Sequence, residues 1–168
     1  MDPSVFNDKI GKSVEKQMTK VMKKAFWDLI RKDLEAEPQK LDHLVILIKE
    51  IKNKLKNLTP SRRDLHTDID ETLDVDFIRQ LFSTSLAAAN ETPHGLYFLN
   101  LIKYLIEKIK TYCAPSMDDE INKWEKNTFE KIKTMETYSE FIPWFFKKLY
   151  RYLDEIQTCI NKFLNIQV

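Results

Sequence analysis

Apolar residues recur every three or four positions through most of this chain, which is the spacing of one face of an α-helix. The pattern predicts helices over about residues 4–35, 40–58, 60–73, 76–89, 95–113, 116–135 and 139–164. Several boundaries carry a capping residue followed by a proline at the first helical position: Asp2-Pro3, Thr59-Pro60 and Thr92-Pro93. Ser116, with Asp119 three residues later, resembles a loose capping box for the sixth helix.

Two of the predicted helices have distinctive apolar faces. The helix over 95–113 is apolar on a broad face, so we expect it to be central and mostly buried. The last helix carries a regular seam in which spacings of four and three alternate: Ile142, Phe146, Leu149, Leu153, Ile156, Ile160 and Phe163. This heptad pattern suits antiparallel bundle packing or a coiled-coil partner. Since no repeat or flexible linker interrupts the chain, we predict an all-α fold, a single irregular helical bundle of about six or seven helices forming one domain over residues 1–168.

Composition narrows the function classes. Lys+Arg 27 against Asp+Glu 26 gives a net charge of +1, which argues against a whole-protein basic surface for nucleic acid. The chain has only 2 Gly, too few for most sheets, phosphate-binding loops and nucleotide-binding enzymes. The first residues are polar and no apolar run approaches the roughly 20 residues of a membrane span, so we expect a protein of the cytoplasm or nucleus.

Catalytic and metal-binding chemistry finds little support. An acidic run over residues 64–76 contains His66 and Asp70 at helical spacing, but it lacks the Gly of a calcium-binding loop. We therefore interpret the run as a solvated acidic face, with Asp74 or Asp76 capping the next helix. Cys113 and Cys159 are interpreted as reduced, buried structural thiols rather than nucleophiles. We predict no catalytic residues, no metal, no cofactor and no enzymatic activity.

Lysine residues gather on two of the predicted helices. The candidate basic patch comprises Lys16, Lys20, Lys23, Lys49, Lys52 and Lys56. Such a patch could contact anionic lipid, nucleic acid or an acidic partner, or it could be the solvated back of a helix. No aromatic residues are interleaved with these lysines, which weakens the hypothesis of single-stranded nucleic-acid binding. The neighbouring acidic run also lies close enough in sequence to neutralise the second half of the patch.

The last predicted helix carries more aromatic residues than its seam explains. Phe141, Trp144, Phe145 and Tyr152 are the candidate partner-binding residues. One helix cannot easily bury both seam and flank against a single neighbour. Either this helix lies centrally in the bundle, or its second face meets another molecule, where exposed aromatic residues would dominate the binding energy.

Three segments resemble a known family when they are taken together and in order. They are Phe26-Trp27-Asp28, the stretch over 69–80 containing Leu73-Asp74, and Tyr112-Cys113-Ala114-Pro115. In this order and spacing the chain resembles the T-complex protein 11 family over about residues 20–126. It departs from the family pattern at Tyr112 and Met117, and the last helix shows no obvious match. The resemblance implies an all-helical, non-enzymatic protein linked with cAMP and protein kinase A signalling and with sperm function, and it supplies no catalytic residues.

The sequence therefore favours binding over catalysis. The leading hypothesis is a helical protein–protein interaction module, modulating a cAMP and kinase signalling assembly if the resemblance extends to function. One alternative is a peripheral membrane or nucleic-acid binder that acts through the Lys-rich helices. Another is a viral helical-bundle protein that captures a host helix, which predicts an apolar groove on the surface. The partner and the oligomeric state are left open.

Overall fold

The computed structural model describes residues 24–37, 39–81, 93–134 and 137–166, and these are helical without any strand, which confirms the all-α prediction. A first helix runs over residues 24–35. It is followed by α2 (Asp42–Leu58), α3 (Arg63–Thr72), α4 (Val75–Leu81), α6 (Pro93–Tyr112), the short 3₁₀ helix η1 (Pro115–Met117), α7 (Asp118–Thr134) and α8 (Tyr138–Ile166). No helix in this described part of the chain is long and apolar enough to span a membrane.

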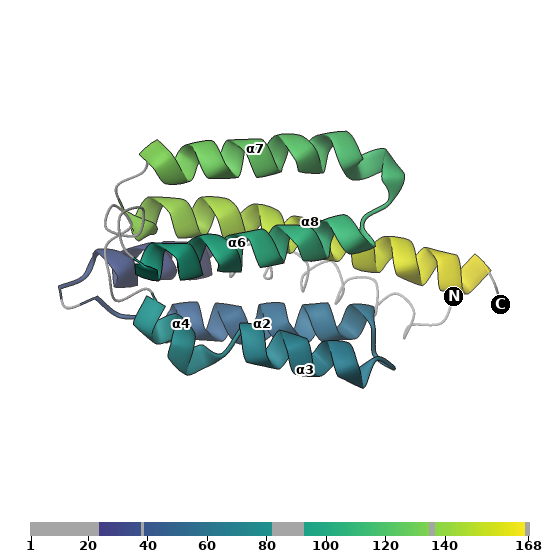
Figure 1. The fold of residues 1–168 in the computed structure, drawn as a ribbon, viewed down its shortest axis with the longest axis horizontal. Helices are drawn as coiled ribbons and strands as arrows, with labels where there is room; N and C mark the ends of the chain where they lie inside the picture. The colour runs from purple at the N-terminus through teal and green to yellow at the C-terminus, as the bar shows by residue number, and fades with distance from the viewer. Residues whose placement is uncertain (1–23, 38, 82–92, 135–136, 167–168) are drawn as a thin grey trace, which may run out of the picture.

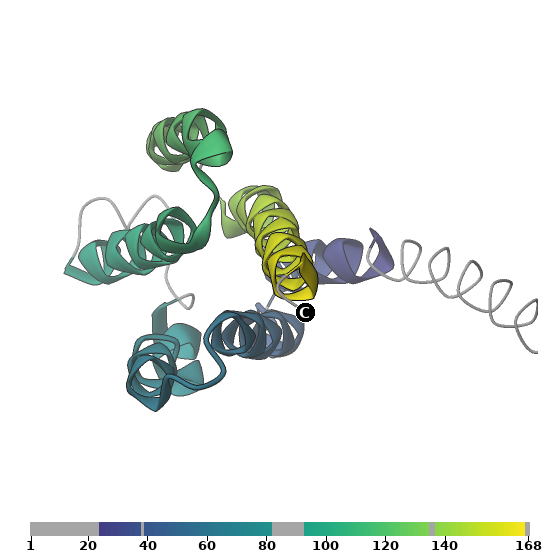
Figure 2. The same cartoon turned by 90° about the vertical axis from the view of Figure 1, so that its right-hand side faces the viewer.

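The helices stack in three layers (Figures 1 and 2). Helices α6 and α8 lie side by side in the middle layer, α7 covers them on one side, and α2, α3 and α4 cover them on the other. The helix over 24–35 lies beside the first half of α8, on the side away from α6 (Figure 2). Helix α8 thus has neighbours on several sides, which corresponds to the central position considered from sequence.

The core follows the predicted apolar faces. In α6 the buried residues are Phe98, Leu101, Ile102, Leu105, Ile106 and Ile109, so this helix is central as predicted. The seam of α8 is buried from Ile142 to Ile156, half-buried at Ile160, and exposed at Phe163. Buried residues from every α-helix of the described chain belong to one continuous hydrophobic cluster. The last turns of α8 extend beyond the other layers, as Figure 1 shows, which explains why the seam ends in solvent.

The helix boundaries agree with the capping signals in part. Pro93 is the first residue of α6, and the Asp74 carboxylate accepts a hydrogen bond from the Phe77 N–H at the start of α4, as predicted. The Thr59-Pro60 start is wrong, because Thr59 ends α2 and the next helix begins only at Arg63. Ser116 is also not a cap, because it lies inside η1, which precedes α7. The Asp2-Pro3 start and the first half of the helix predicted over 4–35 lie outside the described residues.

Candidate binding groove

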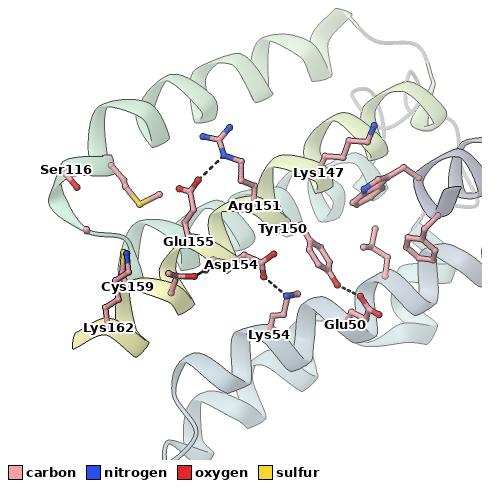
Figure 3. Close-up of a pocket in the computed structure, with 16 residues that line it drawn as sticks. Glu50, Lys54, Ser116, Lys147, Tyr150, Arg151, Asp154, Glu155, Cys159 and Lys162 are labelled. Carbon is pink, nitrogen blue, oxygen red and sulfur yellow. Dashed lines mark hydrogen bonds and ion pairs between the residues drawn. The ribbon is translucent and has the colours of Figure 1, made fainter. Parts of the chain in front are cut away.

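A groove of about 1100 Å³ runs along the face of α8 that is turned away from α6 (Figure 3). Its α8 wall is a single stripe with helical spacing: Lys147, Tyr150, Arg151, Asp154, Glu155, Thr158, Cys159 and Lys162. The α2 wall contributes Leu47, Glu50 and Lys54. The helix over 24–35 forms one end with Phe26 and Trp27, and η1 forms the other with Ser116 and Met117. The groove therefore follows α8 for about four helical turns.

Apolar and aromatic side chains form the first half of the groove. Trp27 is buried and meets Tyr150 edge-on, with ring centroids 6.3 Å apart. Phe26 packs edge-on against Trp27 at 6.1 Å and stays half-buried. Leu47 is fully buried beneath this end. Phe26 and Tyr150 are half-buried, so their rings give this end of the groove aromatic surface of the kind that is enriched in protein-binding sites.

Most charged groups of the groove are ion-paired, and one of these pairs crosses the groove. Lys54 Nζ lies 2.6 Å from Asp154 Oδ1, and this ion pair joins α2 to α8 (Figure 3). The Lys54 ammonium also lies 4.6 Å from the centroid of the Tyr150 ring. Arg151 pairs with Glu155 at 3.0 Å and with Glu120 of α7 at 2.9 Å. The Lys54–Asp154 pair therefore holds the α2 and α8 walls together, and Arg151 ties the α8 wall to α7.

Tyr150 keeps its proton in this setting. Its hydroxyl donates a hydrogen bond to the Glu50 carboxylate, and both residues line the groove. Burial of the phenol raises the pKa of Tyr150. The Glu50 carboxylate raises it further, because it accepts a hydrogen bond from the protonated hydroxyl and repels the phenolate. Tyr150 is therefore a fixed hydrogen-bond donor and not a general base at neutral pH.

The candidate aromatic residues occupy the core. Phe141 and Phe145 are fully buried, and Tyr152 is nearly so, which means that three of the four candidates are not on the described surface. Trp144 is half-buried, with Lys131 Nζ 4.8 Å and Lys148 Nζ 5.6 Å from its ring. Of the two alternatives drawn from sequence, the central position of the last helix accounts for these side chains.

The acidic run serves to neutralise lysines. Asp70 lies 2.6 Å from Lys56 and 3.3 Å from Lys52, so two members of the candidate basic patch are ion-paired. His66 Nε2 lies 2.7 Å from the Thr59 carbonyl oxygen at the end of α2. Lys49 is exposed, and Lys16, Lys20 and Lys23 lie outside the described residues. No group of three or more potential metal-ligating side chains occurs in the part of the chain that the structure describes.

We expect the ion pairs of Asp70 to make a small contribution to stability that is lost in acid. Hydrogen bonds from Lys56 and Lys52 hold the pKa of Asp70 below its usual value, so its contribution is present above about pH 4 and is lost as pH falls through the lowered pKa. Asp70→Asn should therefore cost less than about 1 kcal/mol at pH 6, because the pair is exposed, and less at about pH 2 than at about pH 6. Urea unfolding at both pH values measures this. Asp28→Asn, an exposed carboxylate on the helix over 24–35, is the control, and equal pH dependence of both variants would contradict the assignment.

The two thiols differ from the prediction and from each other. Cys113 is half-buried, and its Sγ lies 3.6 Å from Asp118 Oδ1. Burial raises the pKa of Cys113, and the neighbouring Asp118 carboxylate adds to the effect, so this thiol is poorly nucleophilic. Cys159 is exposed, and the prediction of a buried thiol is wrong there. It lies next to the seam residue Ile160 in sequence, but its side chain is on the groove face of α8.

The groove residues were not identified from the sequence. The sequence interpretation followed the apolar seam of α8 and its aromatic flank, whereas the groove is lined by the opposite, mixed polar stripe. The signal was present as a second run with spacings of three and four, from Lys147 through Tyr150, Asp154 and Thr158 to Lys162. Its polar residues resemble those of an ordinary solvated face. The sequence analysis named Phe26 and Trp27 as parts of a family motif and Cys159 as a thiol, but it assigned none of these groove residues to a binding site.

The fold and the groove define an all-helical domain with an elongated surface site, and the comparisons identify its family. The sequence model of the T-complex protein 11 family matches residues 2–157, and the chain therefore belongs to that family. The match extends beyond the 20–126 of the motif-based resemblance and includes most of α8, the helix in which the motifs gave no obvious match. No solved structure matches the chain.

Several known relatives are similar over about two thirds of the chain. The human T-complex protein 11 homolog is 33% identical over 118 residues, 69% of this chain and 22% of the relative. The rat T-complex protein 11 homolog is 29% identical over 126 residues, 74% of this chain and 21% of the relative. Human T-complex protein 11-like X-linked protein 1 is 30% identical over 115 residues, 67% of this chain and 21% of the relative. The aligned part of this chain thus spans about a fifth of the length of these relatives.

Proposed function

We propose that this domain is a non-enzymatic protein–protein interaction module and that the groove along α8 is its binding site. The observation that carries the proposal is an elongated site with an aromatic end and with walls held by ion pairs between helices. Such a preformed site costs a partner little reorganisation of this domain on binding.

The chemistry of the groove supports binding over catalysis. Asp154 forms an ion pair with Lys54, and Glu155 forms one with Arg151. The Tyr150 hydroxyl donates its hydrogen bond to Glu50. A nucleophile in hydrogen-bond contact with a general base is a common arrangement for covalent catalysis. Cys159, the exposed thiol of the groove, has no hydrogen bond to a base among the described residues.

The signalling role rests on the family. The resemblance implies an assembly containing cAMP-dependent kinase, and we propose that the groove binds a component of such an assembly. The alternative of binding lipid or nucleic acid through the Lys-rich helices has less support, because Lys52 and Lys56 are already paired with Asp70.

Filling the groove should abolish partner binding without unfolding the domain. Thr158 is exposed and lines the groove, so Thr158→Trp places an indole in the space that a partner would occupy. Asn122→Trp, on the exposed face of α7 outside the groove, is the matched control. We expect Thr158→Trp to reduce recovery of specific partners by at least about tenfold, as loss of a central contact would.

The measurement is quantitative mass spectrometry of proteins retained from cell lysate by the full chain and by both variants, after circular dichroism has shown equal helicity. Protein kinase A subunits are followed explicitly. If wild type, Thr158→Trp and Asn122→Trp retain the same proteins in the same amounts, the groove is not the binding site.

A further inference from the structure

The charge pattern of the groove indicates what kind of partner it takes. Its lining has four cationic side chains, Lys54, Lys147, Arg151 and Lys162, and three anionic ones, Glu50, Asp154 and Glu155. Lys54 and Arg151 are bound to acidic partners within the domain. Lys147 and Lys162 are exposed, and neither has an acidic side chain within ion-pair distance in the described residues. Glu50 is also exposed, and its only hydrogen-bond partner in the described part of the chain is the neutral Tyr150 hydroxyl, so the charges left for a partner are two ammonium groups and this one carboxylate.

These two lysines stand at opposite ends of the α8 stripe. Figure 3 shows Lys147 toward the aromatic end and Lys162 toward the η1 end. At the rise of an α-helix, their positions on α8 are about 22 Å apart along the axis. An occupant that reaches both must be elongated and must follow α8 for about four turns.

The backbone of the occupant must satisfy its own hydrogen bonds. The walls of the groove are helices, whose N–H and C=O groups are used internally, and the described residues contain no strand edge on which an extended peptide could pair. A helical occupant forms its backbone hydrogen bonds within itself and needs none from the groove. It can also present an apolar stripe to Phe26, Trp27 and Met117.

From this geometry, and resting on the proposed function, we infer that the groove binds an amphipathic helix of about four turns that carries Asp or Glu near each end of its apolar stripe. One acidic end pairs with Lys147 and the other with Lys162. The apolar stripe packs on Phe26 and Trp27 at one end of the groove and on Met117 at the other. A helix with basic ends would be repelled by the same two ammonium groups. The lysines therefore discriminate between partners as well as stabilise the complex.

The test uses a displayed library of helical peptides of about 18 residues. A Leu stripe is fixed, and the positions flanking it at both ends vary among Glu, Lys and Ser. Selection is performed on the full chain, on Lys147→Glu/Lys162→Glu, and on Lys123→Glu/Lys126→Glu, which makes the same charge change on the exposed face of α7. Binding in the groove is confirmed by protection of the exposed Cys159 thiol from a maleimide.

We expect the wild type and the α7 variant to select Glu at both ends, and the groove variant to select Lys. For a Glu-ended peptide, Lys147→Glu/Lys162→Glu should weaken binding by about tenfold, since two exposed ion pairs are replaced by repulsion. The loss should shrink as salt is raised. Selection of the same ends by all three proteins, or no groove binders at all, would overturn the inference.

Other occupants give different results. If a second copy of this chain fills the groove, Cys159 is protected without peptide, and the protection increases with protein concentration. If another segment of the same chain fills it, the protection is present at every concentration. Either result overturns the inference and leaves the Thr158→Trp experiment to decide the proposed function separately.

Discussion

Replacing Phe145 by Ala should lower the free energy of unfolding by about 3–5 kcal/mol, the usual cost of deleting a buried aromatic ring. Phe145 is fully buried between Trp124 and Phe141, with its ring stacked on theirs at centroid distances of 5.2 Å and 5.5 Å. Removal of the ring leaves a cavity that the flanking rings, each fixed by other contacts, cannot close. For a domain of this size the loss corresponds to a decrease in Tm of about 10 °C.

The measurement is urea unfolding followed by circular dichroism, with the slope of the transition checked for two-state behaviour. Phe163→Ala is the control on the same helix, because Phe163 is 59% exposed and its substitution should change stability by less than about 0.5 kcal/mol. Similar losses for both variants would contradict the central position of α8. The comparison also decides whether Phe145 belongs to the core, as the structure has it, or to a partner surface, as considered from sequence.

Helix periodicity was sufficient to predict the core but not the groove. The broad apolar face of α6 and the seam of α8 identify buried residues because spacing alone determines which side chains share a face. The aromatic flank of α8 is different, since Phe141 and Tyr152 could be buried only if more than one helix packs against α8. That number of neighbours depends on tertiary arrangement, which periodicity does not contain.

The charged residues show the same limit. Lys54 and Asp154 are a hundred positions apart in the chain and 2.6 Å apart in space. A local pattern predicts pairs three or four residues apart on one helix, such as Arg151 with Glu155, but not pairs between helices. The interpretation of the acidic run succeeded because Asp70 and the lysines it neutralises lie on α3 and α2, which are adjacent in sequence. The groove required α2, α8, η1 and the helix over 24–35 to be placed together.

Ile106→Asp should have an effect at least as large as that of Phe145→Ala, and a pH-dependent one. Ile106 is fully buried in α6, within the hydrophobic cluster. A carboxylate there replaces an apolar side chain of the cluster and must either remain charged in an apolar site or take up a proton, and each choice is costly. We expect a loss of more than about 4 kcal/mol at pH 7, enough to unfold a domain of ordinary stability.

The direction of the pH dependence follows from the burial. The introduced Asp would have a pKa raised in the folded state and near 3.9 in the unfolded state, so folding would take up a proton between these values. The penalty is therefore full above the raised pKa and declines as pH falls through it. Ile46→Asp on α2 is the control, because Ile46 is 47% exposed and the same substitution there leaves the carboxylate in water. Urea unfolding of both variants between about pH 7 and pH 4.5 measures the difference. A loss for Ile106→Asp that is small, or equal to that of Ile46→Asp at each pH, would mean that α6 is not the buried centre of this domain.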